Sequence, residues 1–281
     1  MLKIFIGCDP NNCDLEQMMV LDYSIHKHTS QPCDITWLQL SHDPASPFYS
    51  DPASGKGWRT ERWATPFSGL RWAIPELCGF EGRAIYFDAD VVVLSDLAEL
   101  WQHPFDKGSF LLAKSREMHT RLGTCVFDCV AAKKRIPALK KLQKDPRADK
   151  KMKRKLKKKP AYITEYQDTT YNCIDGEGVA AENMKILHYS DMGTQFSHRY
   201  SIPRIEKEGG KHWFDGTIYP HPRPDLAALF DQYYQEALDN GYKLDDYRCE
   251  PFGSFPKKSQ KAYKGNHVTR VDGTPTNVSD A

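Results

Sequence analysis

One short stretch, residues 83–101 (RAIYFDADVVVLSDLAELW), limits the possible folds of this chain more than any other. It opens with an apolar, β-branched and aromatic run over residues 84–87, which is typical of a fully buried central strand. Two carboxylates one residue apart, Asp88 and Asp90, follow at once. Burying two unpaired carboxylates at a strand end costs several kcal/mol. The stretch therefore predicts a hard divalent cation with oxygen ligands at this point.

The position of this acidic pair favours a binding role over an ordinary turn. Asp-x-Asp also occurs by chance, with one acid capping a turn and the other facing water. Open α/β sheets, however, bind ligands in the crevice outside the carboxyl ends of their strands, where Asp88 and Asp90 are expected. A second apolar run covers residues 91–94, and Ser95 is expected to cap a helix over residues 96–101.

The segment FDADVVVLSDLAELW resembles the Asp-x-Asp segment of nucleotide-sugar-dependent glycosyltransferases with the A-type fold. It is most similar to family 8, which includes glycogenin and bacterial lipopolysaccharide galactosyl- and glucosyltransferases. Further stretches match in the same order, so the resemblance covers residues 2–200. It implies an α/β fold of the glycosyltransferase A-type, a Rossmann-like mixed sheet flanked by helices. It also implies that Asp88 and Asp90 hold Mn²⁺, or Mg²⁺, against the diphosphate of the donor.

Three of the matching stretches supply further expected site residues. LKIFIGCDPNN resembles the first strand and loop of the family, in which an aspartate and an asparagine at the positions of Asp9 and Asn11 contact the uridine. An ordinary strand followed by an Asx turn explains these residues equally well. PFSGLRWAIPELCGFEG places Arg71 at the family arginine that reaches the donor sugar or diphosphate, although an arginine on a helix is commonly just solvated. MKILHYSDMGTQFSHR places His188 at the third metal ligand, and imidazole is a competent ligand for manganese.

The sugar site is the least well matched part. Gln167 and Asp168 resemble the family's Gln-Asp element, whose aspartate holds sugar hydroxyls, but Thr169 stands where the family commonly has a second glutamine. LGTCVFDC lacks the family's asparagine, and Gly-Thr-Gln-Phe replaces its diphosphate-contacting lysine or Pro-Trp pair, a role left open to Gln195, His198 or Arg199. The resemblance implies a catalytic set of Asp168, Gln167 and Arg71. It implies a donor-binding set of Gly7, Cys8, Asp9, Asn11, Arg71, Asp88, Ala89 and Gln195.

Length and composition agree with a single α/β domain. The chain has 281 residues, of which 40% are hydrophobic and 12% aromatic, enough for a sizeable core. We expect a nucleotide-sugar-binding catalytic domain over residues 1–200 and a C-terminal helical extension over residues 201–281 that packs on it and ends in a mobile polar tail. Strands are expected over residues 2–8, 34–39, 83–88, 109–113, 123–128 and 184–188, and helices over residues 14–29, 67–77, 96–101, 131–144 and 224–240.

The charge is strongly segregated. Residues 133–159 carry fifteen Lys or Arg and two Asp, a net charge of +13, so that the rest of the chain carries −11 within the overall +2. Such a block is commonly a solvated helix or a disordered loop. Because it is inserted near the expected sugar site, it also indicates an anionic partner: lipid headgroups, lipopolysaccharide, an acidic polysaccharide or nucleic acid. Nucleic acid is disfavoured because the run has no interleaved aromatic residues.

The first residues, MLKIFIGCDP, pass directly into a turn and have neither the length nor the cleavage site of a signal peptide. No apolar stretch approaches the roughly 18 residues of a membrane span. A cytoplasmic protein is expected, with peripheral contact at the inner face of the membrane through residues 150–159. The expected function is retaining, metal-dependent transfer of a hexose from a UDP-sugar to an acceptor hydroxyl, on an anionic glycan or lipopolysaccharide. The alternatives are a nucleotidyltransferase, or a nucleic-acid- or membrane-binding protein that acts through the basic block.

Overall fold

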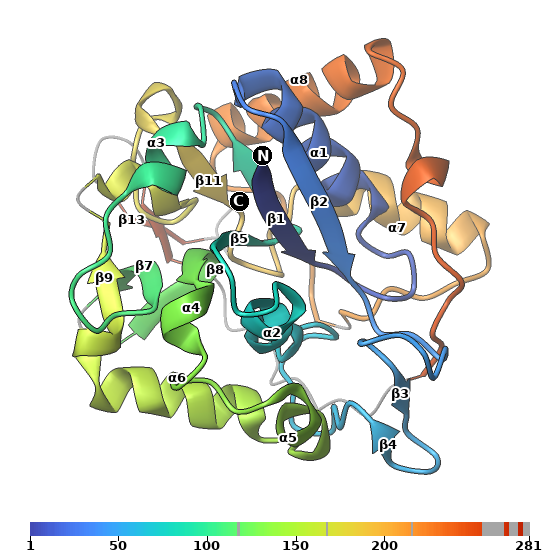
Figure 1. The fold of residues 1–281 in the computed structure, drawn as a ribbon. Coiled ribbons are helices and arrows are strands. Elements are labelled where there is room, and N and C mark those ends of the chain that lie inside the picture. Colours follow the sequence, from blue (N-terminus) through green and yellow to red (C-terminus); the bar gives the residue numbers. More distant parts are fainter. Residues whose placement is uncertain (117–118, 167, 215, 255–266, 270–274, 278–281) are drawn as a thin grey trace.

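The centre of the molecule is a six-stranded mixed sheet in the order β2-β1-β5-β8-β7-β9 (Figure 1). The computed structural model describes residues 1–116, 119–166, 168–214, 216–254, 267–269 and 275–277. The sheet consists of β1 (Leu2–Gly7), β2 (Cys33–Leu38), β5 (Arg83–Asp88), β7 (Leu111–Arg116), β8 (His119–Asp128) and β9 (Ile163–Glu165). β8 runs antiparallel to both of its neighbours, and the other adjacent pairs are parallel. The expected mixed sheet is confirmed.

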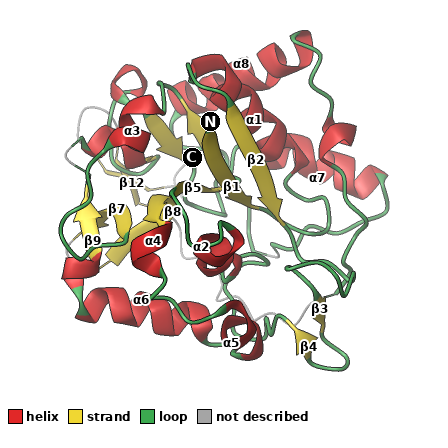
Figure 2. Cartoon of the chain, viewed as in Figure 1, coloured by secondary structure: helices red, strands yellow, loops and turns green. Residues whose placement is uncertain are grey.

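Helices cover both faces of this sheet (Figure 2). The helices are α1 (Leu15–His28), α2 (Ile74–Leu77), α3 (Ala98–Gln102), α4 (Cys129–Ala132), α5 (Leu139–Lys144), α6 (Ala148–Lys158), α7 (His198–Lys207) and α8 (Pro224–Asp239). The described residues also form short 3₁₀ turns, η1 (Leu70–Ala73), η2 (Pro160–Tyr162), η3 (Thr169–Asn172), η4 (Ala181–Asn183) and η5 (Leu244–Tyr247).

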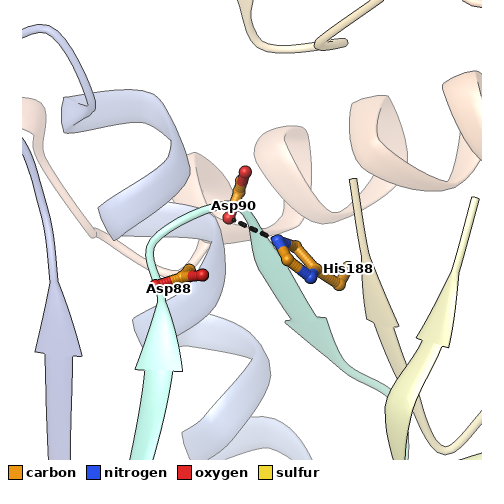
Figure 3. Close-up of side chains that lie close together, drawn as sticks. All are labelled: Asp88, Asp90 and His188. Atoms are coloured by element: carbon orange, nitrogen blue, oxygen red, sulfur yellow. Dashed lines mark ion pairs between the residues drawn. The ribbon is translucent and has the colours of Figure 1, made fainter. Parts of the chain in front are cut away.

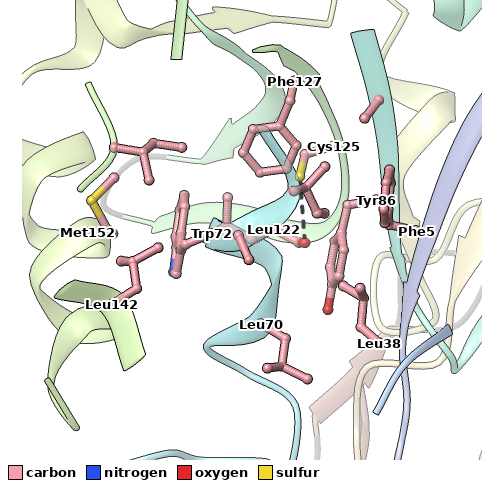
Figure 4. Close-up of a cluster of buried hydrophobic side chains, with 14 of the residues drawn as sticks. Phe5, Leu38, Leu70, Trp72, Tyr86, Leu122, Cys125, Phe127, Leu142 and Met152 are labelled. Atoms are coloured by element: carbon pink, nitrogen blue, oxygen red, sulfur yellow. Dashed lines mark hydrogen bonds between the residues drawn. The ribbon is translucent and has the colours of Figure 1, made fainter. Parts of the chain in front are cut away.

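The alternation of side chains along the central strands divides the core in two. In β5, Ile85 and Phe87 face α1, whereas Tyr86 faces the opposite side with Phe5 of β1. This second side packs against η1, α2, α5 and α6, with Trp72 as its largest fully buried side chain (Figure 4). Both faces of β5 are thus covered, which explains its continuous apolar sequence.

A second, three-stranded sheet decides where the site forms. It has the order β10-β11-β6 and contains β6 (Val91–Val93), β10 (Cys173–Ile174) and β11 (Ile186–His188). β11 runs antiparallel to β6, with His188 opposite Val91, and the backbone N–H of Tyr189 continues the ladder by donating to the carbonyl of Asp90 at 2.9 Å. The strand after the acidic pair is therefore paired with the strand that ends at His188.

Three expected helices differ from those observed. The helix expected over residues 67–77 is shorter and begins with η1. Ser95 does not cap α3, because the carboxylate of Asp96 accepts the backbone N–H of Ala98 at 2.9 Å and the helix starts at Ala98. The helix expected over residues 131–144 is broken into α4 and α5, since Pro137 lies between them and restricts the backbone before it. The rest of the basic block, for which a solvated helix or a disordered loop was expected, forms α6.

The region after residue 200 packs on the same body. α8 begins at Pro224, as expected, and lies against α1, where Lys27 pairs with Glu236 at 2.5 Å. The backbone N–H of Phe252 donates to the carbonyl of Pro10 at 3.0 Å. The expected mobile tail falls mostly outside the described residues, and within it β12 (His267–Thr269) pairs antiparallel with β13 (Pro275–Asn277). None of the described helices is both long enough and apolar enough to cross a membrane.

Two smaller strands, β3 (Ser50–Asp51) and β4 (Lys56–Gly57), form a hairpin inside the long polar loop at residues 41–65. This loop is anchored to the body: Trp58 and Trp63 are buried, and the backbone N–H of Arg59 donates to the carbonyl of Gln143 at 2.9 Å.

Candidate metal and substrate site

A cleft of about 400 Å³ opens at the carboxyl ends of β1 and β5. The cleft is lined by Asp88, the last residue of β5, and by Ala89 and Asp90 in the turn between β5 and β6. The backbone N–H of Ala89 donates to the carbonyl of Gly7 at 3.0 Å and ties this turn to the end of β1. The acidic pair therefore lies in the crevice where open α/β sheets bind their ligands.

His188 completes a three-residue cluster with the acidic pair (Figure 3). One candidate ligand atom from each of Asp88, Asp90 and His188 lies within 4.8 Å of the other two. Nε2 of His188 is 3.0 Å from Oδ1 of Asp90. Asp88 and His188 end strands of two different sheets, Asp90 lies in the turn after Asp88, and the β6–β11 pairing brings the three together. The structure thus brings the three expected residues together as a possible metal site, and their role as ligands stays a prediction.

The electrostatics of the cluster suit a cation. Burial alone lowers the pKa of His188, but Asp90 and, to a smaller degree, Asp88 raise it to about 9. Oδ1 of Asp90 is buried, and the ring of His188 lies against it at 3.0 Å. Two carboxylates and an imidazole form a donor set for Mn²⁺ or Mg²⁺ that leaves coordination positions for ligand oxygens.

Gly123 of β8 provides the space for this cluster. A Cβ atom at residue 123 would overlap Cε1 and Nδ1 of His188 and would lie 3.1 Å from Oδ2 of Asp88. Any side chain there would push the two ligands aside. The bare backbone of Gly123 and the buried Oδ1 of Asp90, which lies against the His188 ring, both fit a metal ion held by these three residues.

Arg71 holds Asp88 in position from η1. Arg71 is buried, with 5% of the residue exposed, and its Nη2 donates to Oδ1 of Asp88 at 3.1 Å. Nη1 and Nε donate to the carbonyls of Leu122 and Ser68 at 2.6 and 3.2 Å. The hydroxyl of Tyr86 donates to the same Oδ1 of Asp88, which leaves Oδ2 facing the cluster.

Gln195 plays the corresponding part for Asp90. Its Nε2 donates to Oδ2 of Asp90 at 2.6 Å, and its Oε1 accepts from Nε2 of Gln17 at 3.0 Å. Such contacts from outer residues fix the orientation of metal ligands. Arg71 and Gln195 were both expected at the donor, and the structure places both at the acidic pair.

Comparison with known proteins identifies the fold. No family model matches the chain, and no curated protein matches its sequence. Among solved structures, galactosyltransferase LgtC in complex with donor and acceptor sugar analogues matches 84% of this chain and 96% of its own length, with a TM-score of 0.53 and 11% identity. Glycosyltransferase GlyE of Streptococcus pneumoniae matches 85% of this chain with a TM-score of 0.54 and 14% identity. The bifunctional glycosyltransferase WbbM matches 75% of this chain with a TM-score of 0.50 and 15% identity.

The fold is that of the A-type glycosyltransferases. The chain spans 62% of GlyE and half of WbbM, so both of those proteins are longer than the part they share with it. At identities of this size, the likeness establishes the A-type glycosyltransferase fold, and activity has to be argued from the site.

The residues expected at the uridine lie beside the cleft and do not line it. Asp9 is completely buried, and its Oδ2 accepts the backbone N–H groups of Asn11 and Cys13 at 2.6 and 3.1 Å. Burial raises the pKa of Asp9 to about 6. The side chain of Asn11 exchanges hydrogen bonds with the backbone of Gly253. Hydrogen bonds to residues 249–253 thus hold the loop after β1 in place.

Gly7 and Cys8 are held tightly in the same region. A Cβ at Gly7 would overlap the hydroxyl of Tyr86, and Cys8 is fully buried. Neither residue lines the described cleft, so their roles in donor binding stay predictions.

Asp168 is not among the residues that line the described cleft. Its Oδ1 accepts the backbone N–H of Thr170 at 2.9 Å, which caps η3, and its Oδ2 lies 2.8 Å from Nζ of Lys185. Burial raises the pKa of Asp168, but Lys185 and Thr170 lower it more, to about 2. Gln167 lies outside the described residues.

Sequence reasoning missed several residues of the cleft wall. They come from the start of α1, the loop before η1, β8, α6, the segment after β11 and the loop between α7 and α8, and they include Asp14, Gln17, Thr65, Ser68, Arg121, Gly123, Lys153, Ser190, Met192 and Trp213. Asp14 and Gln17 lie three residues apart at the helix that follows the first strand, a spacing that could have indicated one shared face. The lone glycine in LGTCVFDC was a further signal, since glycine inside a strand indicates close approach.

Proposed function

We propose that the protein is a metal-dependent glycosyltransferase that moves a hexose from a UDP-sugar to an acceptor hydroxyl with retention of anomeric configuration. The observation that carries this proposal is the cluster of Asp88, Asp90 and His188 in a cleft at the strand ends of an A-type glycosyltransferase fold.

A divalent cation held by the cluster supplies Lewis-acid stabilisation of the negative charge that develops on the departing diphosphate. The side chains of the protein prepare this position. Arg71 and Gln195 fix the two carboxylates, and His188 gives up its proton when it becomes a ligand. Arg121 and Lys153 also line the cleft, and each of them pairs with a carboxylate, Glu177 and Asp149 respectively.

The described cleft offers no carboxylate placed as a covalent nucleophile. Asp88 and Asp90 belong to the metal cluster, and Oδ2 of Asp14 accepts the backbone N–H of Asp9 at 2.8 Å. We therefore propose that the acceptor hydroxyl attacks the anomeric carbon on the face that UDP leaves. The C–O bond to UDP breaks, the new C–O bond forms, and the hydroxyl proton passes to a phosphate oxygen. Contact of Asp168 with sugar hydroxyls belongs to this proposal.

A nucleotidyltransferase is the alternative that uses the same chemistry of carboxylates and a divalent cation. Such an enzyme would normally have a basic, glycine-rich loop after the first strand. Here that loop reads CDPNN, and it is closed by hydrogen bonds to residues 249–253.

Calorimetry of UDP binding and a donor panel test the proposal together. Binding of UDP is expected to require Mn²⁺ or Mg²⁺ and to vanish with EDTA. In a panel of nucleotide sugars with Mn²⁺, slow hydrolysis is expected for at least one UDP-hexose. UDP binding that EDTA leaves unchanged would overturn the metal assignment. Pyrophosphate release from a nucleoside triphosphate and a sugar phosphate, without hydrolysis of any nucleotide sugar, would favour the nucleotidyltransferase.

A further inference from the structure

Helix α6 belongs to the basic block of residues 133–159 and forms part of the cleft wall. Lys153 of α6 lines the cleft that holds the metal cluster. Nε1 of Trp72 donates to Oδ1 of Asp149 at 3.0 Å, and Trp72 follows Arg71 directly in η1. In η1, Arg71 thus contacts Asp88 of the metal cluster and Trp72 contacts Asp149 of α6. The helix is therefore held at a defined position beside the site.

Carboxylates compensate the positive charge on the exposed side of α6 only in part. Lys150, Lys153 and Lys157 recur at a spacing of three and four residues, which places them along one stripe of the helix. Lys153 pairs with Asp149 at 2.8 Å, whereas no described carboxylate forms an ion pair with Lys150, Arg154 or Lys157. Like charges at this spacing repel one another, and an anionic partner relieves the repulsion.

We infer that this stripe, Lys150, Lys153 and Lys157, binds an anionic glycan and that this glycan is the acceptor. The inference rests on the proposed function and adds the class of the acceptor to it. A linear glycan with carboxylate or phosphate groups places charges along α6 while one of its hydroxyls enters the cleft past Lys153. The helix of 11 residues is about 16 Å long, so several charged groups of one chain contact it together.

The composition of α6 separates a glycan from two other anionic partners. The apolar side chains of the helix, Ala148, Met152 and Leu156, are all buried in the core, so none is exposed to enter a lipid bilayer. The helix has no aromatic residue for stacking on bases. The nearby ring of Tyr162 is already covered by Arg135, whose guanidinium carbon lies 4.7 Å from the ring centre. Purely ionic contacts remain, and they suit a charged polysaccharide.

The test compares two matched variants of the full chain. Lys150→Gln/Lys157→Gln removes two charges from the stripe. Lys151→Gln/Lys158→Gln removes two charges of the same type with the same spacing, displaced by about 100° around the helix axis. The probes are polygalacturonate, neutral dextran, and vesicles that contain phosphatidylglycerol. Affinities are measured at low and at physiological salt.

Polygalacturonate is expected to bind the parent and the second variant alike, and to bind the first variant about fivefold or more weakly, with a smaller salt dependence. Amine-reactive footprinting read by mass spectrometry is expected to show polygalacturonate protecting Lys153 and not Lys158. Equal losses in both variants, or equal binding of dextran, would overturn the inference. Vesicles that bind more tightly than polygalacturonate would assign the stripe to a membrane surface instead.

The same proteins are tested for UDP and Mn²⁺ binding, which both variants are expected to retain. A parent that binds polygalacturonate through the stripe without binding UDP and Mn²⁺ would contradict the proposed function and leave the stripe as a glycan-binding site. A parent that binds UDP and Mn²⁺ with no difference between the variants would contradict only the assignment of the acceptor.

Discussion

At the scale of single residues, the two acidic side chains of the site are not equivalent. Asp88 has one oxygen fixed by Arg71 and Tyr86, which leaves the other oxygen available to the cluster. Asp90 has Oδ2 fixed by Gln195, and its Oδ1 lies 3.0 Å from Nε2 of His188, the third candidate ligand. Each carboxylate therefore has one oxygen held by neighbouring side chains and one oxygen that faces the cluster, where a cation would bind.

Asp90→Asn tests this division. The amide removes the negative charge, and we expect Mn²⁺-dependent UDP affinity to fall by more than about 100-fold, because even residues that only orient metal ligands change affinity by 10–100-fold. The folded structure should persist, since Asp90 is in a turn and outside the apolar core. Asp34→Asn, an exposed aspartate on β2, is the control. Calorimetry that shows equal affinities for the two variants would contradict the role of Asp90.

Gly123→Ala tests the space behind the cluster. The added methyl group would overlap the ring of His188, so we expect the ring to shift and Mn²⁺-dependent UDP binding to be lost. The midpoint temperature of unfolding should fall only slightly, because the rest of β8 keeps its pairing with β5. Crystal structures or NMR spectra of the His188 ring in parent and variant would check the cause. Unchanged UDP affinity would show that the close approach has no role in binding.

At the scale of elements, the site depends on the pairing of β6 with β11. The sequence identifies β5 by its apolar run and the acidic pair by its position after that run, and it predicts α8 from Pro224 and its periodic apolar residues. It does not predict that His188 stands opposite Val91, because this register joins segments far apart in the chain. The resemblance supplied His188 where spacing alone could not. The break at Pro137 could have been predicted from the residue type, whereas the docking of α6 through Trp72 could not.

Glu177 joins the two sheets and makes stability depend on pH. Its carboxylate pairs with Lys114 of β7 and Arg121 of β8, and it accepts the backbone N–H of Ile174 of β10 at 3.0 Å. Burial raises the pKa of Glu177, but Arg121, the Ile174 N–H and Lys114 together lower it by more, and the resulting pKa is about 2. Because the folded-state pKa lies below the ordinary value near 4.5, this contribution is complete above pH 4.5 and is lost as the pH falls towards 2.

Glu177→Gln should therefore destabilise the protein by about 3 kcal/mol at neutral pH. The difference in unfolding free energy between parent and variant should shrink between pH 4.5 and pH 2, which denaturant titrations at several pH values would measure. Glu182→Gln, close in sequence but exposed, is the control and should show no such trend. A constant difference over this range would mean that the ion pairs of Glu177 do not stabilise the fold.

At the scale of the whole molecule, the cluster joins two sheets. Asp88 ends a strand of the six-stranded sheet, Asp90 lies in the turn that follows, and His188 ends a strand of the three-stranded sheet. A bound cation would add a cross-link between them on top of the β6–β11 pairing. Ligand binding is thus expected to change the stability of the whole fold as well as the local site.

The last prediction measures this link by thermal unfolding. At free ligand concentrations of about 100 times the dissociation constant, binding adds about 2.7 kcal/mol, which for a chain of this size raises the midpoint by roughly 5 °C. UDP with Mn²⁺ should give this rise, EDTA should reverse it, and Asp90→Asn should abolish it, while Asp34→Asn should behave like the parent. Proteolysis near β10 and β11 should slow in parallel, because these short strands belong to the smaller sheet that the cation would hold. A rise that is the same with EDTA would show that UDP binds without the cluster, and the metal would then have no part in holding the two sheets together.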